Sequence, residues 1–183
     1  MTIGFYKSFI GQEGKKVSIL GRIKTDIETA YDLYSDTLYR IALSHLHSDE
    51  DAQDAVHDVF IRYINSSPAF RDSNHEKAWF IRTTVNRCHD ILRYKKVRNH
   101  ITLDEISEIT SDDSEKELQN EVIRLVSQLD DKYKSVIILH YLEGYSVKEI
   151  SSILQISESN TKMRLARGRD LLKNIIIKEE NDV

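Results

Sequence analysis

The sequence predicts an all-α protein in which two small helical domains are joined by an acidic flexible linker. The first observation is that one proline, Pro68, and six glycines in 183 residues leave few turns for β-hairpins. The second is that apolar residues recur at helical spacing over most of the chain. The third is a segregated charge pattern, in which two basic segments flank an acidic one. With 31% charged and 40% apolar residues, the composition is that of a core-forming protein.

The net charge of −4 conceals this segregation. Residues 71–98 contain eight basic and three acidic side chains, and residues 162–178 contain six basic side chains and one acidic one, so each segment carries +5. Residues 104–121 contain eight acids and one lysine. Basic segments of this kind suit an anionic partner such as nucleic acid. We therefore expect an N-terminal extension at 1–24 with no assigned role, a first domain at 25–98, an acidic linker at 99–117 and a second domain at 118–178.

Three helices are expected in the first domain. Apolar residues keep helical spacing in residues 26–46 and 52–65. A long third helix is expected over residues 76–98, after a break at residues 66–75. We interpret Trp79 in this third helix as an anchor of the core. Three or four helices in a domain of this length make a compact bundle.

The second of these helices begins with an acidic segment. Residues 49–58 contain five acids and no Lys or Arg. Asp51, Asp54 and Asp58 follow the i, i+3, i+7 spacing of one helical face, which suits a basic protein partner. Taken alone, the segment is better explained as a solvated acidic face. A docking surface for a basic partner is favoured only if the rest of the chain indicates such a partner.

Residues 145–169 contain the pattern of a helix-turn-helix. Ser146 and Glu149 match a capping box at the start of one short apolar-periodic helix. A three-residue break follows, and Ser157 is the expected N-cap of the next helix. Gln155 lies in this break, where turns of this kind often have glycine, which implies a cost of up to ~1 kcal/mol if its φ is positive.

The second helix of this pair has one face suited to DNA. We take Thr161 as pointing inward, and Leu165, Gly168 and Leu172 then lie on the same side at 100° per residue. The opposite face can enter a major groove by its first turns, while basic side chains around it neutralise phosphates. The candidate DNA-binding residues are Ser159, Asn160, Lys162, Met163, Arg164 and Arg167. The alternative is an ordinary helical hairpin with a solvated basic face.

Two parts of the chain resemble bacterial RNA polymerase sigma factors of the extracytoplasmic-function (ECF) class. The stretches "DLYSDTLYRIALSHLHSDEDAQDAVHDVFIRYI" and "FRDSNHEKAWFIRTTVNRCHDILR" resemble sigma region two. The stretch "LVSQLDDKYKSVIILHYLEGYSVKEISSILQISESNTKMRLARGRDLLKN" resembles region four. The resemblance covers about residues 25–176. It implies a protein that is not an enzyme, needs no cofactor, binds core RNA polymerase, recognises −35 and −10 promoter elements and melts the −10 element.

The resemblance also implies roles for particular residues. The acidic helix would dock on the coiled coil of the polymerase's largest subunit, with the flap as a second contact; the residues concerned are Asp51, Asp54, Asp58 and Phe60. The third helix and the loop before it would hold a base flipped out of the −10 element; the residues concerned are Phe70, Arg71, Arg82, Thr83, Asn86 and Asp90. Basic groups interleaved with polar and aromatic ones are what single-stranded DNA binding needs. Gln53 and His57 depart from the residues usual in the docking helix.

Promoter DNA is a further implied partner, as is an anti-sigma factor, which is often membrane-bound for this class. No small-molecule substrate is implied, and the expected location is the cytoplasm. A stand-alone helix-turn-helix regulator that binds operator DNA remains the alternative, although residues 25–98 show no signature of a sensor or dimerisation domain. An enzyme is disfavoured because the sequence shows no paired carboxylates with a nucleophile and no Gly-rich phosphate loop.

Cysteine, histidine and hydropathy patterns add three negative expectations. The single cysteine, Cys88, suits a reducing cytosol, and we expect it to be a buried thiol. Its neighbour His89, with His45 and His47 upstream, forms no metal-binding signature. No apolar run approaches the ~20 residues of a membrane span. Charged and polar residues interrupt the N-terminal 20 residues, which therefore make a poor signal peptide.

Overall fold

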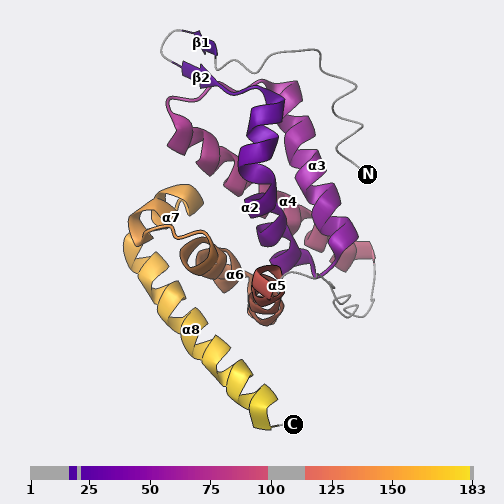
Figure 1. Ribbon diagram of the computed structural model, residues 1–183, viewed down its shortest axis with the longest axis vertical. Coiled ribbons are helices and arrows are strands. Elements are labelled where there is room, and N and C mark those ends of the chain that lie inside the picture. Colours follow the sequence, from indigo (N-terminus) through magenta and orange to yellow (C-terminus); the bar gives the residue numbers. More distant parts are fainter. Residues whose placement is uncertain (1–16, 20–21, 99–113, 182–183) are drawn as a thin grey trace.

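The computed structural model describes residues 17–19, 22–98 and 114–181. Within these ranges the chain is helical apart from one short hairpin (Figure 1). The elements are β1 (Val17–Ile19), β2 (Arg22–Lys24), α2 (Ile27–Leu46), α3 (Asp49–Ser66), α4 (Ser73–Arg98), α5 (Ser114–Ser127), α6 (Asp131–Ile137), the π-helix η1 (Ile138–Leu142), α7 (Val147–Leu154) and α8 (Glu158–Asn181). The all-α prediction is confirmed, with the hairpin as an addition.

The hairpin and the start of α5 differ from the sequence-based expectation. Strands β1 and β2 pair antiparallel, with Val17 opposite Lys24, inside the predicted N-terminal extension. Three-residue strands are too short for the alternation that reveals a strand. Helix α5 begins at Ser114, inside the predicted linker, because the residues after Ser114 are good helix formers. The rest of that linker, residues 99–113, and residues 1–16 of the extension lie outside the described residues.

Side-chain caps fix where the first helices begin. The carboxylate of Asp26 accepts a hydrogen bond from the backbone N–H of Thr29 and starts α2. The hydroxyl of Ser48 starts α3 in the same way. Helix α4 begins three residues earlier than expected, because Asp72 accepts a hydrogen bond from the backbone N–H of His75 at 2.8 Å. Each such cap is worth about 1 kcal/mol.

The core of the first domain is an aromatic cluster at the crossing of α2, α3 and α4. The ring of Phe80 is the hub, with centroids 4.7 Å from Tyr34, 5.0 Å from Tyr63 and 5.3 Å from Phe60. Trp79 is only half-buried and lies at the edge of this cluster. Trp79 therefore packs against the core as predicted, but Phe80 is the more central residue.

A buried carboxylate connects the same three helices where the N-terminal ends of α2 and α4 meet the C-terminal end of α3. Glu76, in the first turn of α4, is 1% exposed and accepts hydrogen bonds from Thr25 at 2.8 Å and from Tyr34 at 3.3 Å. The hydroxyl of Tyr63 donates to the backbone carbonyl of Thr25. Burial and the nearby Glu76 carboxylate raise the pKa of both tyrosines. Burial of a carboxylate costs free energy unless hydrogen bonds compensate, so this network stabilises the position of the start of α4.

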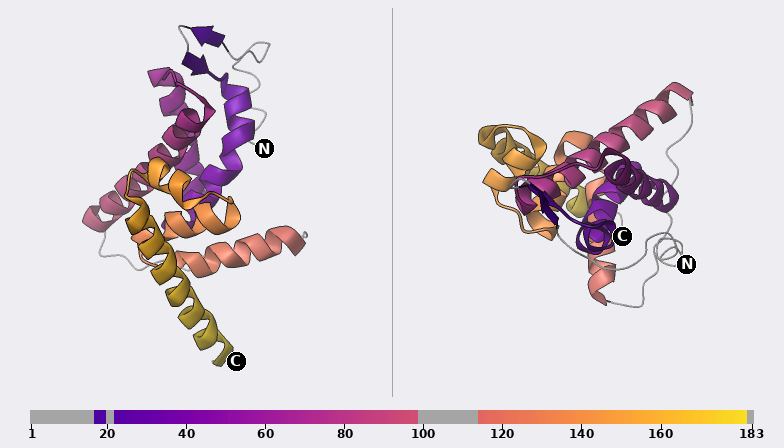
Figure 2. Two further views of the ribbon diagram at one scale, coloured as in Figure 1. Left: turned by 90° about the vertical axis from the view of Figure 1, so that its left-hand side faces the viewer. Right: turned by 90° about the horizontal axis from the view of Figure 1, so that it is seen from above.

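In the second domain, α6 and η1 form the central layer against which α7 and α8 pack. Gly168 in the middle of α8 allows the closest approach, because a Cβ atom there would lie 2.9 Å from Cδ1 of Ile137. The buried stripe of α8 therefore runs along α6. At the end of α8, Glu179 forms an ion pair with Arg124 of α5 at 2.7 Å. This pair attaches α5 to the part of α8 that extends beyond α6 (Figure 2).

The two domains pack against each other. Helices α5 and α6 contact the C-terminal half of α2, and α7 lies beside α4 (Figures 1 and 2). His45 of α2 is consequently 1% exposed, although it is polar, and its imidazole lies beside Ser135 of α6. Cys88 on the facing side of α4 is fully buried as well, and burial raises the pKa of its thiol to about 12. The expectation of a buried thiol is confirmed.

Candidate nucleic-acid interface

The helix-turn-helix predicted from the sequence is present as α7 and α8. Ser146 and Glu149 form the complete capping box at the start of α7. Gln155, the residue that follows α7, has φ 55° in the left-handed region, so the cost expected for a non-glycine residue is incurred. The hydroxyl of Ser157 then accepts a hydrogen bond from the backbone N–H of Asn160 at 3.1 Å and starts α8. Local sequence signals therefore set the whole turn.

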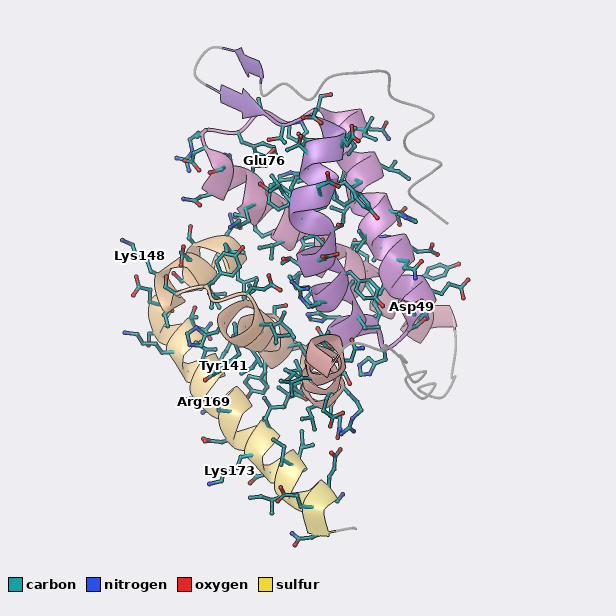
Figure 3. The ribbon with its side chains drawn as sticks, viewed as in Figure 1. Asp49, Glu76, Tyr141, Lys148, Arg169 and Lys173 are labelled. Atoms are coloured by element: carbon teal, nitrogen blue, oxygen red, sulfur yellow. The ribbon has the colours of Figure 1, made fainter. Side chains whose placement is uncertain are left out.

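Helix α8 is oriented as predicted. Thr161 is 0% exposed and Leu165 is 6% exposed, and Gly168 is buried with them against α6. On the opposite side, the exposed candidates are Ser159, Lys162, Met163 and Arg167. Lys148, Arg169 and Lys173 also extend outward from α7 and α8 (Figure 3). The first three turns of α8 thus present an accessible polar and cationic surface.

The other two α8 candidates have partners within the protein. The guanidinium of Arg164 donates to the side-chain oxygen of Asn160 at 3.0 Å and to the carbonyl of Lys132 at 3.3 Å. Both Asn160 and Arg164 are half-buried. These bonds connect the start of α8 to the start of α6, so the two residues hold the helix in position as well as bordering its exposed face.

The candidates on α4 and its preceding loop are divided between surface and core. Arg71, Asn86 and Asp90 are exposed. Thr83 is half-buried and donates to the carbonyl of Trp79 at 2.7 Å. Asp90 forms an ion pair one turn along α4 with Arg93 at 3.2 Å. Exposed cations and an exposed amide on one helix can contact an unpaired DNA strand.

Phe70 does not lie on that surface. It is 1% exposed, with its ring against Tyr63, His75 and Trp79. The expectation that Phe70 lines a pocket for a flipped base is corrected in this structure, because burial of the ring under the loop removes more apolar surface from water than exposure would. Its present role is to hold the loop that carries Arg71 against the core.

The acidic face of α3 is partly neutralised from within the protein. Asp51 forms an ion pair with Lys95, and Asp58 forms one with Arg87 at 2.5 Å. Asp54 is exposed and has no ion pair among the described residues. Both partner cations come from α4, which explains why an excess of acid on α3 is compatible with a stable bundle.

Phe60 is not available to a partner, because it is 0% exposed in the aromatic core. The expectation that its side chain contacts the polymerase is therefore corrected. Its spacing relative to the acids places it on the inner face of α3, where apolar burial is most favourable. The apolar helical spacing of residues 52–65 agrees with this inward position, and only the resemblance had assigned Phe60 to the docking surface.

No sequence pattern predicts the polar contacts that join the two domains. Glu143, just after η1, accepts hydrogen bonds from Arg40 at 2.7 Å and from Thr37 at 2.6 Å, both on α2. The side chains of Arg40 and Glu143 are only 23% and 10% exposed. Residues more than 100 positions apart make these bonds, and no local pattern predicts such a pairing.

A second group of polar contacts lies between α2 and α6. His45 Nε2 is 2.8 Å from the hydroxyl of Ser135, and His47 Nε2 is 3.0 Å from the ammonium of Lys134. Lys134 also forms an ion pair with Asp131 at 3.2 Å. Burial lowers the pKa of His45, and burial together with the Lys134 charge lowers that of His47 to about 4. Both imidazoles are therefore neutral in this interface near pH 7.

The third contact involves a predicted DNA-binding residue. The guanidinium of Arg82 on α4 donates to the carbonyl of Ile153 near the end of α7 at 3.3 Å. Nearby, the ammonium of Lys77 lies 4.9 Å from the ring centroid of Tyr145. A cavity of about 610 Å³ opens here between α4 and α7, and its lining includes Arg71, Lys77, Arg82, Lys148 and Glu149. The packing of the domains thus occupies part of the α4 surface.

Comparison with known proteins identifies both halves of the chain. Residues 30–98 match the model of sigma-70 region 2, and residues 119–172 match that of sigma-70 region 4. The ECF RNA polymerase sigma factor SigW of Bacillus subtilis (strain 168) is 29% identical over 157 residues, covering 78% of this chain and 84% of SigW. SigM of the same strain is also 29% identical, over 161 residues that cover 85% of this chain and 98% of SigM.

Two solved structures share the fold. The sigma factor RpoE from Bartonella quintana, in complex with the anti-sigma factor NepR, gives a TM-score of 0.70 at 19% identity over 82% of this chain and 96% of RpoE. CnrH, in complex with the cytosolic domain of CnrY, gives 0.58 at 20% identity over 83% of this chain and 88% of CnrH.

The chain belongs to the ECF class of RNA polymerase sigma factors, which direct transcription initiation and are not enzymes. Membership in this class displaces the alternative of a stand-alone regulator. Within the described part of the chain, no helix is both long enough and apolar enough to cross a membrane.

The domain contact at Glu143 leads to a prediction about shape and stability. Glu143→Ala leaves the half-buried Arg40 and Thr37 without their acceptor, so we expect the free energy of unfolding to fall by about 1–3 kcal/mol. We also expect the radius of gyration in small-angle X-ray scattering to rise, because the domains separate. Glu179→Ala is the matched control, since its partner Arg124 lies in the same domain. Scattering curves for Glu143→Ala identical to those of the control would contradict the prediction.

Proposed function

We propose that this chain binds core RNA polymerase through the acidic face of α3, recognises the −35 element through the start of α8, and melts the −10 element through α4. In this proposal residues 25–98 and 118–178 act as two units, joined by residues 99–117. The observation that carries the proposal is the α8 surface, where exposed polar and cationic side chains lie opposite a stripe buried on α6. An exposed helix face after a tight turn is what a major groove admits.

At the −35 element, we assign different tasks to different α8 side chains. Ser159 and Met163, on the exposed face near the helix start, are suited to contact base edges. Lys162 and Arg167 are suited to contact phosphates, which position the helix without reading sequence. Arg164 acts through its bonds to Asn160 and to α6, and so sets the angle at which the helix is presented.

At the −10 element, we assign the contacts to the exposed residues of α4 and its loop. Asn86 offers an amide to a base edge, and Arg71 offers a cation to the backbone. Thr83 and Asp90 border the same surface. Arg82 joins it only after its bond to Ile153 is released, so promoter melting requires the domains to separate. Phe70 contributes by holding the loop in place.

For partners and location, the relatives suggest two further assignments. RpoE was solved with the anti-sigma factor NepR, and CnrH was solved with the cytosolic domain of CnrY. We infer that this chain, too, is held by an anti-sigma factor and works in the cytoplasm, with core polymerase and promoter DNA as its other partners.

The acidic face can be tested with one substitution. Asp54→Lys places a cation where a basic polymerase surface is expected, and like charges across such a contact cost several kcal/mol. We expect affinity for core polymerase, measured by fluorescence anisotropy, to fall by roughly 10- to 100-fold or more. Asp36→Lys on α2, an equally exposed site with the same charge change, is the control. Equal affinities for the two variants would remove this face from the proposal.

The division between reading and positioning on α8 can be tested by two alanine variants. Arg167→Ala should weaken binding to all promoter duplexes similarly and lower the slope of log K against log salt by about 1, because one phosphate contact is lost. Met163→Ala should instead change the preference at one or two −35 positions by ~1–3 kcal/mol. Holoenzyme binding to a randomised −35 library measures both. An unchanged sequence profile for Met163→Ala would show that the helix is oriented differently.

The melting assignment is tested at Asn86, which is exposed and so can be changed without opening the core. Asn86→Ala should retain core binding but reduce run-off transcription and permanganate reactivity of −10 thymines, because holding a flipped base repays a few kcal/mol of unstacking. A template with a premelted −10 region should restore activity only in part. Asn65→Ala, an exposed amide on α3, is the control. Wild-type opening by Asn86→Ala on linear duplex would place the pocket elsewhere.

A further inference from the structure

Three side chains able to bind a metal ion meet where the two domains pack. His45 comes from α2, His89 from α4 and Asp131 from the first turn of α6. One nitrogen or oxygen from each lies within 4.8 Å of the others. The imidazole centroids of His45 and His89 are 5.5 Å apart, and His45 Nδ1 lies 3.7 Å from the Asp131 carboxylate. No pair of these residues is close in sequence, so no ligand spacing reveals the cluster.

The central residue, His45, is buried with one ring nitrogen unpartnered. Its side chain is fully buried, and its Nδ1 has no hydrogen-bond partner within the described structure. Its other nitrogen, Nε2, lies 2.8 Å from the hydroxyl of Ser135. Metal binding selects the tautomer in which Nε2–H donates to that hydroxyl, because Nδ1 then carries a lone pair on the side of Asp131. Metal-binding histidines have this arrangement, in which the second nitrogen is fixed by a hydrogen bond.

The other two residues can adjust to an ion. His89 is exposed, and the Asp131 side chain is 48% exposed, so both can rotate without disturbing the core. Bonds of about 2.0–2.1 Å to a tetrahedral ion place ligand atoms ~3.4 Å apart, a contraction that side-chain rotation supplies. Water completes the coordination on the exposed side.

The charges around the cluster limit which ion fits. Lys134 lies 3.2 Å from one carboxylate oxygen of Asp131 and 3.0 Å from His47 Nε2, so a cation already neutralises part of the acid. Two imidazoles and one shared carboxylate are a poor site for Mg²⁺ or Ca²⁺, which need several oxygen ligands. Nitrogen ligands favour Zn²⁺ and the neighbouring transition metals.

We propose that His45, His89 and Asp131 bind one divalent transition-metal ion, with Zn²⁺ as the model ion, and that the ion holds the two domains together. Two ligands belong to the first domain and one to the second, so the complete site exists only while the domains are packed. An ion that binds only this arrangement stabilises it by mass action. Because Arg82 is engaged by α7 in the same arrangement, the bound ion opposes promoter engagement. That last consequence rests on the proposed function, whereas the site itself does not.

The site is tested with metal-free full-length protein. Zn²⁺ titration in competition with a chromophoric chelator should show one equivalent bound, and Co²⁺ should give the visible absorption of a low-coordinate site containing nitrogen ligands. His89→Ala, at an exposed position, should weaken Zn²⁺ binding at least tenfold, and Asp131→Asn should weaken it as well. His57→Ala on α3 is the matched control and should bind like wild type. Absence of stoichiometric binding, or equal affinity for His89→Ala and His57→Ala, would overturn the site.

The effect on domain packing is measured separately from transcription. Zn²⁺ should lower the radius of gyration of the Glu143→Ala variant towards that of wild type, and should not do so when His89→Ala is also present. An ion that binds but leaves the radius unchanged would overturn the domain-bridging role. Should Zn²⁺ compact the protein while promoter opening is unaffected, the link to the proposed function fails and the site stands.

Discussion

The packing of α6 against the C-terminal half of α2 is the contact on which the arrangement of the molecule depends. It buries the polar side chain of His45, and it places Glu143 within reach of Arg40. With α6 in this position, α7 lies beside α4, and the guanidinium of Arg82 donates to the carbonyl of Ile153 near the end of α7. The polar contacts of the interface thus form a chain set by one helix crossing, beside the apolar core that both domains share. Such polar contacts are suited to opening, because each of their groups can be satisfied by water instead.

The strength of these contacts indicates how readily the domains separate. Partly buried hydrogen bonds contribute about 1 kcal/mol each, and bonds to charged groups about 1.5–3 kcal/mol. The few that join the domains therefore amount to several kcal/mol, which a large polymerase surface can replace. The apolar cores within each domain, centred on Phe80 and on Ile137, are much more costly to open. Breaking these polar contacts therefore costs less than unfolding either domain.

What the sequence could predict follows from the range of the interactions involved. The capping box at Ser146, the strained turn at Gln155 and the inward stripe through Thr161 depend on residues within a few positions, and all were predicted. The burial of Phe70 was missed, because whether an aromatic in a loop turns inward depends on the helices that pack beside it. The domain contacts and the histidine cluster join residues roughly 40 to 100 positions apart. Side chains that no local pattern relates can meet only through the tertiary fold.

The packing of the two domains covers some of the proposed binding surfaces and leaves others exposed, and this difference gives an order of events. Asp54 on α3 and the reading face of α8 are exposed while the domains are packed, whereas Arg82 on α4 is engaged by α7. Core polymerase can therefore meet the acidic face first. Its contacts with both domains would then compete with the α2–α6 interface, since polymerase gains surface only if the domains move apart. On the proposed function, melting follows core binding because the α4 surface becomes complete only after that separation.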